Sequence, residues 1–233
     1  MKCDSRLLEK LQSTRELPSV PAVLPSLASV LRISPPEKTV SRIVVLGTST
    51  GGPRALQEFL PELPADFPVS MIVVQHMPAG FTAPFAKRLN GLSRVTVCEA
   101  QHGEALAPGT VYIAPGGQHT TLLRNSLRVS FCLSDTPADT THRPSVDVTM
   151  RSVAAIFGAS TLGIILTGMG CDGLEGMTAI HQAGGLTIGQ DEASSVVYGM
   201  PRCCAKRGIL KRVVPLSQVP RHILQAIHYG CRT

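Results

Sequence analysis

The chain has 233 residues and is 43% hydrophobic, which is enough to bury one sizeable core but not two full domains. Its formal net charge is +6, yet it has no tryptophan and only 4% aromatic residues, so it lacks the stacking surfaces typical of single-stranded nucleic-acid binding, and we expect no nucleic-acid partner. Because Lys and Arg are scattered along the sequence, the charge suits an acidic protein partner or simply solubility.

The first part of the sequence is broken by prolines. Residues 5 to 17 are charged and weakly amphipathic, and five prolines then precede the first strong apolar run. We interpret residues 1–38 as a linker or a remnant segment, and residues 39–233 as a single domain.

Short Val/Ile/Leu runs then alternate with helical patterns, which is typical of a parallel sheet covered on both faces. The predicted strands are 42–47, 70–75, 94–99, 111–114, 161–167, 186–190 and 212–215. Helices are predicted to begin at Pro53, Thr82, Ser145, Asp172, Pro201 and Pro220, and Gly230 is predicted to end the last one. Residues 120–133 resemble an antiparallel hairpin. The predicted fold is α/β, a doubly wound, mostly parallel sheet with this hairpin at one edge.

The first predicted strand runs into the sequence Gly47-Thr48-Ser49-Thr50-Gly51, a G-x-S-x-G turn. Such a turn lifts one hydroxyl clear of a sheet, and Pro53 suits the first turn of the helix that follows. Ser49 is therefore the candidate nucleophile.

Two more polar residues follow predicted strands: His76 comes after 70–75, and Asp172 comes shortly after 161–167. Reactive residues of parallel α/β proteins gather at the carboxyl ends of strands. A serine hydroxyl needs a base to take its proton, and a carboxylate on the other ring nitrogen orients that base. We therefore predict a nucleophile Ser49, a base His76 and an orienting acid Asp172. Because Asp172 is a strand-end residue, Asp172→Asn is expected to cause a large loss of turnover but to change folding little.

Accessory roles follow from position. Backbone N–H groups around Thr50 and Gly51, helped by the turn at Met169, are predicted to stabilise an oxyanion. Arg143 is a candidate for binding substrate. Ser145 lies in a local cluster with His142 and Asp147, but it is predicted to start a helix rather than to act as a nucleophile.

Other interpretations stay open at this point. The glycine turn is also compatible with a phosphate cradle, although neither a Rossmann nor a P-loop motif is present. His76 alone is compatible with a structural histidine, and Asp172 alone with a helix cap. Cys171 is a better candidate for a turn residue than for a nucleophile. No His spacing indicates a metal site.

The seven cysteines show no paired spacing, and the N-terminal residues show no apolar signal-peptide core. No uncharged apolar stretch reaches the roughly 20 residues of a membrane helix. We expect reduced thiols, a cytoplasmic location and no membrane insertion.

Six separated blocks resemble the catalytic domain of chemotaxis protein-glutamate methylesterases, the CheB family, over about residues 41 to 230. The blocks are residues 47–53, 75–82, 113–116, 142–148, 166–173 and 190–201. In that family the serine of the first block, the histidine of the second and the aspartate of the fifth form the triad. These positions are Ser49, His76 and Asp172 here. The resemblance also places Thr50 and Met169 around the oxyanion and the cleft.

The resemblance implies hydrolysis of glutamate γ-methyl esters on the cytoplasmic region of chemoreceptors, and deamidation of glutamines there, without a cofactor or metal. Binding of a phosphate or acyl group without turnover and hydrolysis of another ester are the alternatives. Family members typically carry an N-terminal receiver domain of about 100 residues, which residues 1–38 are too short to form. The resemblance therefore does not carry phosphorelay control over to residues 1–38, and it identifies no separate regulatory protein.

Overall fold

The computed structural model describes residues 41–126 and 128–229. These residues belong to the second of two units into which the chain divides, residues 38–233. The predicted linker, 1–38, and the predicted helix stop at Gly230 lie outside the described residues.

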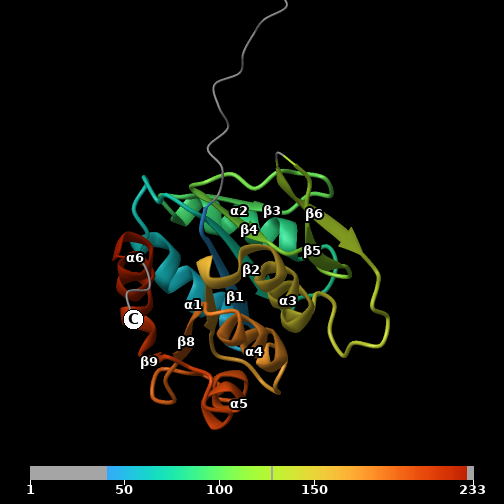
Figure 1. Cartoon of the computed structure of the whole chain (residues 1–233). Coiled ribbons are helices and arrows are strands. Elements are labelled where there is room, and N and C mark those ends of the chain that lie inside the picture. The colour runs from blue at the N-terminus through green and yellow to red at the C-terminus, as the bar shows by residue number, and fades with distance from the viewer. Residues whose placement is uncertain (1–40, 127, 230–233) are drawn as a thin grey trace, which may run out of the picture. The chain divides into compact units, whose positions relative to one another are not determined.

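A seven-stranded sheet, parallel throughout, forms the centre of this unit (Figure 1). Its strand order is β3-β4-β2-β1-β7-β8-β9. The strands are β1 (Ile43–Thr48), β2 (Ser70–Gln75), β3 (Thr96–Glu99), β4 (Thr110–Ile113), β7 (Thr161–Ile165), β8 (Leu186–Gln190) and β9 (Arg212–Val214). Every strand of the predicted sheet is present, and the central strands β1, β2 and β7 are buried on both faces, as their continuous apolar sequences predict.

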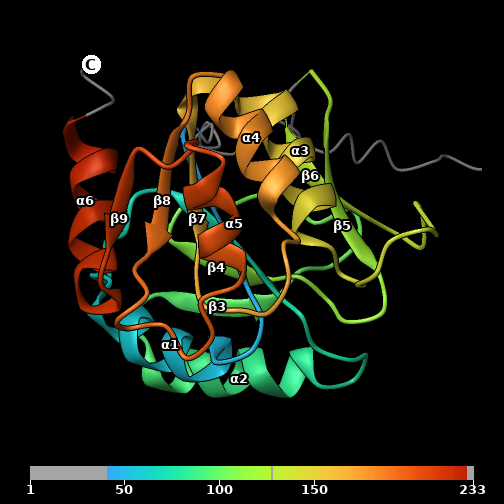
Figure 2. The ribbon, with the colours of Figure 1, turned by 90° about the horizontal axis from the view of Figure 1, so that it is seen from below.

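Helices cover both faces of the sheet (Figure 2). Alternate residues of β1 separate the two cores: Val44 and Leu46 pack with α1, α2 and α6, whereas Ile43 and Val45 pack with α3, α4 and α5. The helices are α1 (Gly52–Phe59), α2 (Thr82–Leu92), α3 (Val146–Phe157), α4 (Leu174–Gln182), α5 (Met200–Lys206) and α6 (Val219–Tyr229), with short 3-10 turns at Leu60–Glu62, Gly158–Ser160 and Leu216–Gln218. The doubly wound α/β class is confirmed.

The order of strands reverses between β1 and β7. From β1 the chain continues through α1 to β2 on one side, and from β7 it continues through α4 to β8 on the other. In an open parallel sheet the loops at such a point separate and leave a crevice beyond the carboxyl ends of the strands. Ser49 follows β1 and Asp172 lies in the β7–α4 loop, so both border this crevice.

The predicted hairpin is present as β5 (His119–Arg124) and β6 (Val129–Ser134), an antiparallel pair. It does not extend the edge of the main sheet, as its sequence suggested, but forms a separate two-stranded sheet. It packs on α3 instead, where Thr149 Oγ1 donates to Thr120 O at 2.8 Å and Ser152 Oγ accepts from Leu122 N at 2.8 Å. These two α3 hydroxyls bind the backbone of β5 and so hold the hairpin on α3. The local strand pattern gives no sign of these partners.

Within residues 41–126 and 128–229, no helix is both long and apolar enough to cross a membrane.

Candidate active site

The serine turn is held by the backbone of the neighbouring strand. Ser49 N donates to Thr167 O at 3.0 Å, and Gly52 N closes the turn by donating to Ser49 O at 2.9 Å. Gly51 has a φ of 87°, in the left-handed region that favours glycine, and it precedes α1. The side chain of Ser49 is half-buried at the carboxyl end of β1, as the motif predicts.

The sheet register brings His76 beside Ser49. Thr48 pairs with Gln75 at the ends of β1 and β2, so the next residue on each strand is Ser49 and His76. His76 N donates to Thr48 O at 3.2 Å. The amide of Gln75 joins the two, because its Nε2 donates to Ser49 O at 3.0 Å and to His76 O at 3.1 Å. The parallel pairing therefore lines up two residues that lie 27 positions apart in the chain.

His76 is paired with Asp172. Its Nε2 lies 2.7 Å from Oδ2 of Asp172, and both side chains are largely buried, at 8% and 13% exposed. Because a carboxylate can only accept, Nε2 carries the proton and Nδ1 is left as the basic nitrogen. This pair joins the second and third predicted residues directly.

The carboxylate of Asp172 is saturated with donors. Oδ2 accepts from His76 and from Val146 N at 2.8 Å, and Oδ1 accepts from Ser145 Oγ at 2.9 Å and from Asp147 N at 3.0 Å. Burial pushes the pKa of Asp172 upward, but the hydrogen bonds from His76 and from the Asp147 and Val146 N–H groups outweigh it and hold that pKa at about 2. Asp172 is thus a fixed anion.

The third link, from Ser49 to His76, is open in this structure. Nδ1 of His76 is buried and has no hydrogen-bond partner among the described residues. A buried acceptor without a donor is costly. It suits a nitrogen that receives a hydroxyl proton during reaction, since catalytic hydrogen bonds in free enzymes often tighten only when substrate binds.

His142 lies in a local cluster and in the fourth resemblance block, but the sequence assigns it no role. Its ring stacks on His76 with centroids 4.0 Å apart and an interplanar angle of 23°. Burial lowers the pKa of His142, and its closeness to the His76 ring lowers it further. The stack therefore presents a flat, uncharged face that restricts rotation of the His76 ring.

The candidate oxyanion and substrate residues lie at the same edge. Thr50 is exposed at the start of the turn, and Met169, in the β7–α4 loop, is 73% exposed. Gly168 adjoins the serine, since a Cβ built on it would lie 2.9 Å from Cβ of Ser49. Arg143 is exposed and uses its guanidinium to donate to Ala138 O at 2.9 Å, which holds the loop before α3. The roles predicted for these residues stay predictions.

A second serine and a second histidine also lie near Asp172. Ser145 Oγ contacts Asp172, and Ser145 N donates to Nδ1 of His119 at 3.3 Å. This set is triad-like in composition, but the His119 ring meets the backbone N–H of Ser145 rather than its hydroxyl. Ser145 is the N-cap of α3, accepting from Val148 N, and only 4% of it is exposed. It starts a helix, as the sequence predicts.

The cysteines depart from the sequence expectation. Cys171, predicted to be a reduced turn residue, forms a disulfide with Cys203 of α5. Their Cα atoms are 5.6 Å apart although the two residues are 32 positions apart in sequence. The tertiary approach of α5 to the β7–α4 loop creates this pair, so residue spacing carried no signal for it. Among the described residues, Cys98, Cys132 and Cys204 are free.

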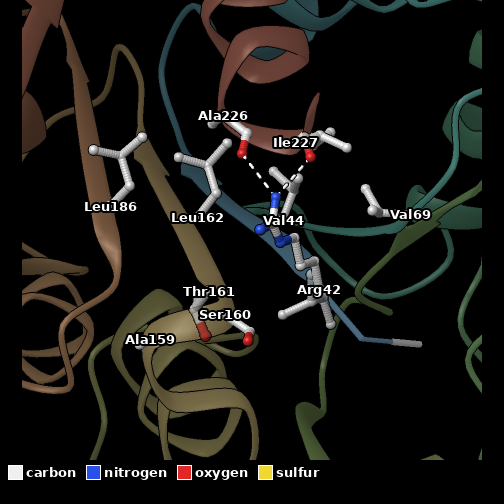
Figure 3. A pocket seen from close by; sticks show the side chains of 11 residues that line it. Arg42, Val44, Val69, Ala159, Ser160, Thr161, Leu162, Leu186, Ala226 and Ile227 are labelled. Carbon is white, nitrogen blue, oxygen red and sulfur yellow. Dashed lines mark hydrogen bonds between the residues drawn. The ribbon is translucent and has the colours of Figure 1, made fainter. Parts of the chain in front are cut away.

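A pocket of about 230 Å³ lies away from this edge, at the amino ends of the strands (Figure 3). Arg42 borders it and donates from Nη1 to Ile227 O at 2.6 Å and Ala226 O at 3.2 Å, near the end of α6. Its other lining residues include Val44, Thr161 and Leu186. The Arg42 guanidinium therefore satisfies carbonyl groups near the end of α6. The pocket is separate from the edge of the sheet that carries Ser49. Within the described part of the chain, no group of three His, Cys, Asp or Glu residues is arranged to hold a metal ion.

The chain is a doubly wound α/β protein, and a serine turn, a neighbouring histidine and a buried carboxylate lie at the switch point of its parallel sheet. The family model described as CheB methylesterase matches residues 44–223, so the chain belongs to the CheB methylesterase family.

Relatives agree with this assignment. A protein of Nitratidesulfovibrio vulgaris named protein-glutamate methylesterase/protein-glutamine glutaminase 2 is 46% identical over 189 residues, covering 81% of this chain and 52% of the relative. A protein of Oleidesulfovibrio alaskensis named protein-glutamate methylesterase/protein-glutamine glutaminase 1 is 39% identical. That match covers 98% of this chain and 69% of the relative. The chain thus spans about half the length of the first of these relatives.

A solved structure has the same fold. The crystal structure of the Thermotoga maritima CheB methylesterase catalytic domain superposes with a TM-score of 0.78 at 42% identity. The match covers 80% of this chain and 99% of that domain.

Proposed function

We propose that this protein hydrolyses glutamate γ-methyl esters, and deamidates glutamines, on the cytoplasmic region of methyl-accepting chemoreceptors. The observation that carries the proposal is the buried His76–Asp172 pair, 2.7 Å between Nε2 and Oδ2, immediately beside the Ser49 turn. Family membership supports the choice of substrate, since the relatives named above are protein-glutamate methylesterases and protein-glutamine glutaminases.

Acylation uses all three residues. Ser49 Oγ attacks the side-chain carbonyl carbon and gives its proton to Nδ1 of His76. The imidazolium that forms is stabilised by Asp172, which stays ionised because its pKa is held at about 2. The tetrahedral intermediate then collapses, the bond to methoxide or to the amide nitrogen breaks, and His76 returns the proton so that methanol or ammonia leaves.

Deacylation repeats the sequence with water. His76 takes a proton from water as its oxygen attacks the acyl carbon of the Ser49 ester. The bond from the carbon to Ser49 Oγ breaks, Oγ recovers the proton, and a glutamate carboxyl group is released. Every step is assigned to side chains of this protein.

Backbone N–H groups of Thr50, Gly51 and Met169 are proposed to stabilise the oxyanion. They belong to loops at the carboxyl ends of β1 and β7, and α1 begins just after Gly51, so its positive N-terminal dipole adds to the effect. Arg143 is proposed to contact the substrate from the exposed segment before α3.

The domain and location assignments are part of this proposal. Residues 39–233 are the methylesterase domain and residues 1–38 a linker, and the protein acts in the cytoplasm, where the modified region of chemoreceptors lies. The sheet, the two cores and the candidate site all fall within 41–229, which supports the domain limits.

The first test is labelling with a fluorophosphonate, which reacts with activated serines. Peptide mass spectrometry after trypsin is expected to find the adduct in residues 43–54, which contain Ser49. Ser49→Ala is expected to abolish both labelling and methanol release from methylated receptor. Equal methanol release by Ser49→Ala would overturn the proposal.

Ser145 is the serine that this test must exclude as the nucleophile, because its hydroxyl also contacts Asp172. The same digest separates the two, since Ser145 lies in peptide 129–151. An adduct there, retained in Ser49→Ala, would assign the chemistry to Ser145. Binding of methylated receptor without methanol release by the wild-type protein would favour a binding module instead.

A further inference from the structure

The carboxylate of Asp172, in the β7–α4 loop, is bound by groups at the start of α3. Three of the four donors to Asp172 come from the start of α3: the Ser145 hydroxyl and the N–H groups of Val146 and Asp147. The fourth donor is His76. The side chain that faces the imidazole is therefore oriented by α3 and not by its own loop alone.

The connection is reciprocal. Asp147, in the first turn of α3, accepts from Gly173 N at 3.0 Å and Gly176 N at 2.7 Å at the start of α4. Asp172, just before α4, accepts from the start of α3. Each aspartate thus caps the helix of the other, which fixes the backbone on both sides of the His76–Asp172 pair.

The Ser145 hydroxyl has a defined direction. Its oxygen accepts from Val148 N at 3.4 Å, so its hydrogen is free to point to Oδ1 of Asp172. The backbone of Ser145 is anchored by His119, which is fully buried and whose Nε2 lies 3.0 Å from Pro137 O. Burial lowers the pKa of His119, so a neutral ring with Nδ1 as acceptor matches both contacts.

We propose that Ser145 is a positioning residue for the triad: its hydroxyl holds Oδ1 of Asp172 and thereby turns Oδ2 toward Nε2 of His76, which leaves Nδ1 facing Ser49. The inference rests on the proposed function, in which Asp172 orients the base. Without this donor the carboxylate keeps its bonds from Val146 N and Asp147 N, but Oδ1 loses one of its two donors, so the carboxylate and the imidazole that it binds are held less firmly. A misplaced catalytic group lowers the turnover number more than it weakens substrate binding.

The test removes the hydroxyl in two ways. Ser145→Ala deletes both the hydroxyl and the cap, whereas Ser145→Gly deletes the hydroxyl at a position where glycine is well tolerated. Ser145→Thr restores a hydroxyl. Ser152→Ala is the matched control. Ser152 also lies on α3, and its hydroxyl accepts from the backbone N–H of Leu122 and does not contact Asp172. Thermal unfolding confirms that each variant is folded.

Kinetics give the first readout. Ser145→Ala and Ser145→Gly are expected to lower kcat for methanol release, and the rate of Ser49 phosphonylation, by roughly 10- to 100-fold, the size of effect found when the outer hydrogen bond that orients a metal ligand is lost. KM is expected to change less than about twofold. Ser145→Thr is expected to recover most of the rate, and Ser152→Ala to stay near wild type.

Proton NMR gives a second readout, at the His76–Asp172 hydrogen bond itself. The Nε2–H of His76, bonded to Asp172 at 2.7 Å, is expected to give a far-downfield resonance in the wild-type protein and in Ser152→Ala. Ser145→Ala and Ser145→Gly are expected to shift or broaden it, and Ser145→Thr to restore it.

Several outcomes would overturn the proposal. If Ser145→Ala and Ser145→Gly keep both the resonance and the wild-type rate while Ser49→Ala is inactive, the positioning role is wrong and the proposed function stands. If Ser152→Ala is slowed as much as Ser145→Ala, helix stability explains the loss. If the wild-type protein does not react at Ser49, the proposed function fails, and the NMR result alone decides whether Ser145 orients Asp172.

Discussion

Asp172 shows how one side chain serves the site and the fold together. Considered only as a strand-end residue, it was expected to contribute little to folding. In the structure it caps α3 through Val146 N and Asp147 N and also binds His76. An aspartate that satisfies the start of a helix and is held as an anion contributes to stability as well as to chemistry.

Asp172→Asn is therefore expected to lower the free energy of unfolding by about 2 kcal/mol at pH 7, besides its loss of turnover. The folded pKa is about 2 against the ordinary 3.8, so this stabilisation is fully present above about pH 4 and is lost as the pH falls through 2. Denaturant unfolding between pH 7 and pH 2.5 should show the difference between wild type and variant shrinking.

The pH experiment must account for the titration of Asp147, and it uses Asp66→Asn as a control for charge. Burial raises the pKa of Asp147, and the Asp172 charge raises it further, so ionisation of Asp147 opposes folding and its effect has the opposite sign with pH. Asp66→Asn, at an exposed aspartate, controls for the loss of one negative charge. A difference between wild type and Asp172→Asn that does not vary with pH would contradict the assignment of a depressed pKa.

At the scale of elements, a glycine sets how closely α3 approaches β1. A Cβ on Gly47 would clash with Cγ1 of Val146, the first residue of α3, and would lie 3.2 Å from Cδ1 of Ile165. A Cβ on Gly173 would meet the same Val146 side chain at 2.8 Å. Val146 is thus seated between two glycines, and this contact holds the α3 N-terminus next to the serine strand.

Gly47→Ala is expected to lower the free energy of unfolding by about 1–3 kcal/mol, the usual cost of overpacking a core, and to slow Ser49 labelling because α3 is pushed away. Gly91→Ala is the matched control. Gly91 lies in α2 with nothing within 4 Å of the added methyl group, so alanine is expected to stabilise by about 0.5–1 kcal/mol. Denaturant unfolding and labelling rates check both, and equal effects would contradict the packing argument.

At the scale of the whole molecule, the Cys171–Cys203 bond joins the loop that carries Asp172 to α5. It closes a span of 32 residues that includes α4 and β8. A cross-link over such a span stabilises chiefly by restricting the unfolded chain, by about 4 kcal/mol in that account. The bond is therefore expected to raise the free energy of unfolding.

Reduction with dithiothreitol is expected to lower the melting temperature by roughly 7–15 °C. Cys171→Ser/Cys203→Ser is expected to melt at the reduced value with or without reductant, whereas Cys132→Ser, at a free cysteine, should still respond. A non-reducing tryptic digest should contain residues 152–202 linked to residues 203–206. Separate peptides, together with a melting temperature indifferent to reductant, would contradict the bond.

Much of the fold could be predicted from local patterns. The continuous apolar runs of β1, β2 and β7 indicated buried parallel strands, because only a sheet covered on both faces buries every residue of a strand. The glycines and the proline after β1 indicated the turn at Ser49. His76 was found because parallel pairing places the residues after neighbouring strands side by side. The catalytic roles of these residues stay predictions.

Local sequence patterns therefore predict the features that depend on neighbours a few positions apart: the strand and helix periods, the serine turn, and the three polar residues that follow strands. Four features arise only from long-range packing: β5–β6 on α3, the stack of His142 on His76, the α3 donors to Asp172 and the Cys171–Cys203 bond. The physical reason is that each of these contacts joins segments far apart in the chain. Their geometry depends on how closely helices pack on the sheet, which is set by side-chain volumes such as those at Gly47 and Val146 and leaves no periodic pattern in the sequence.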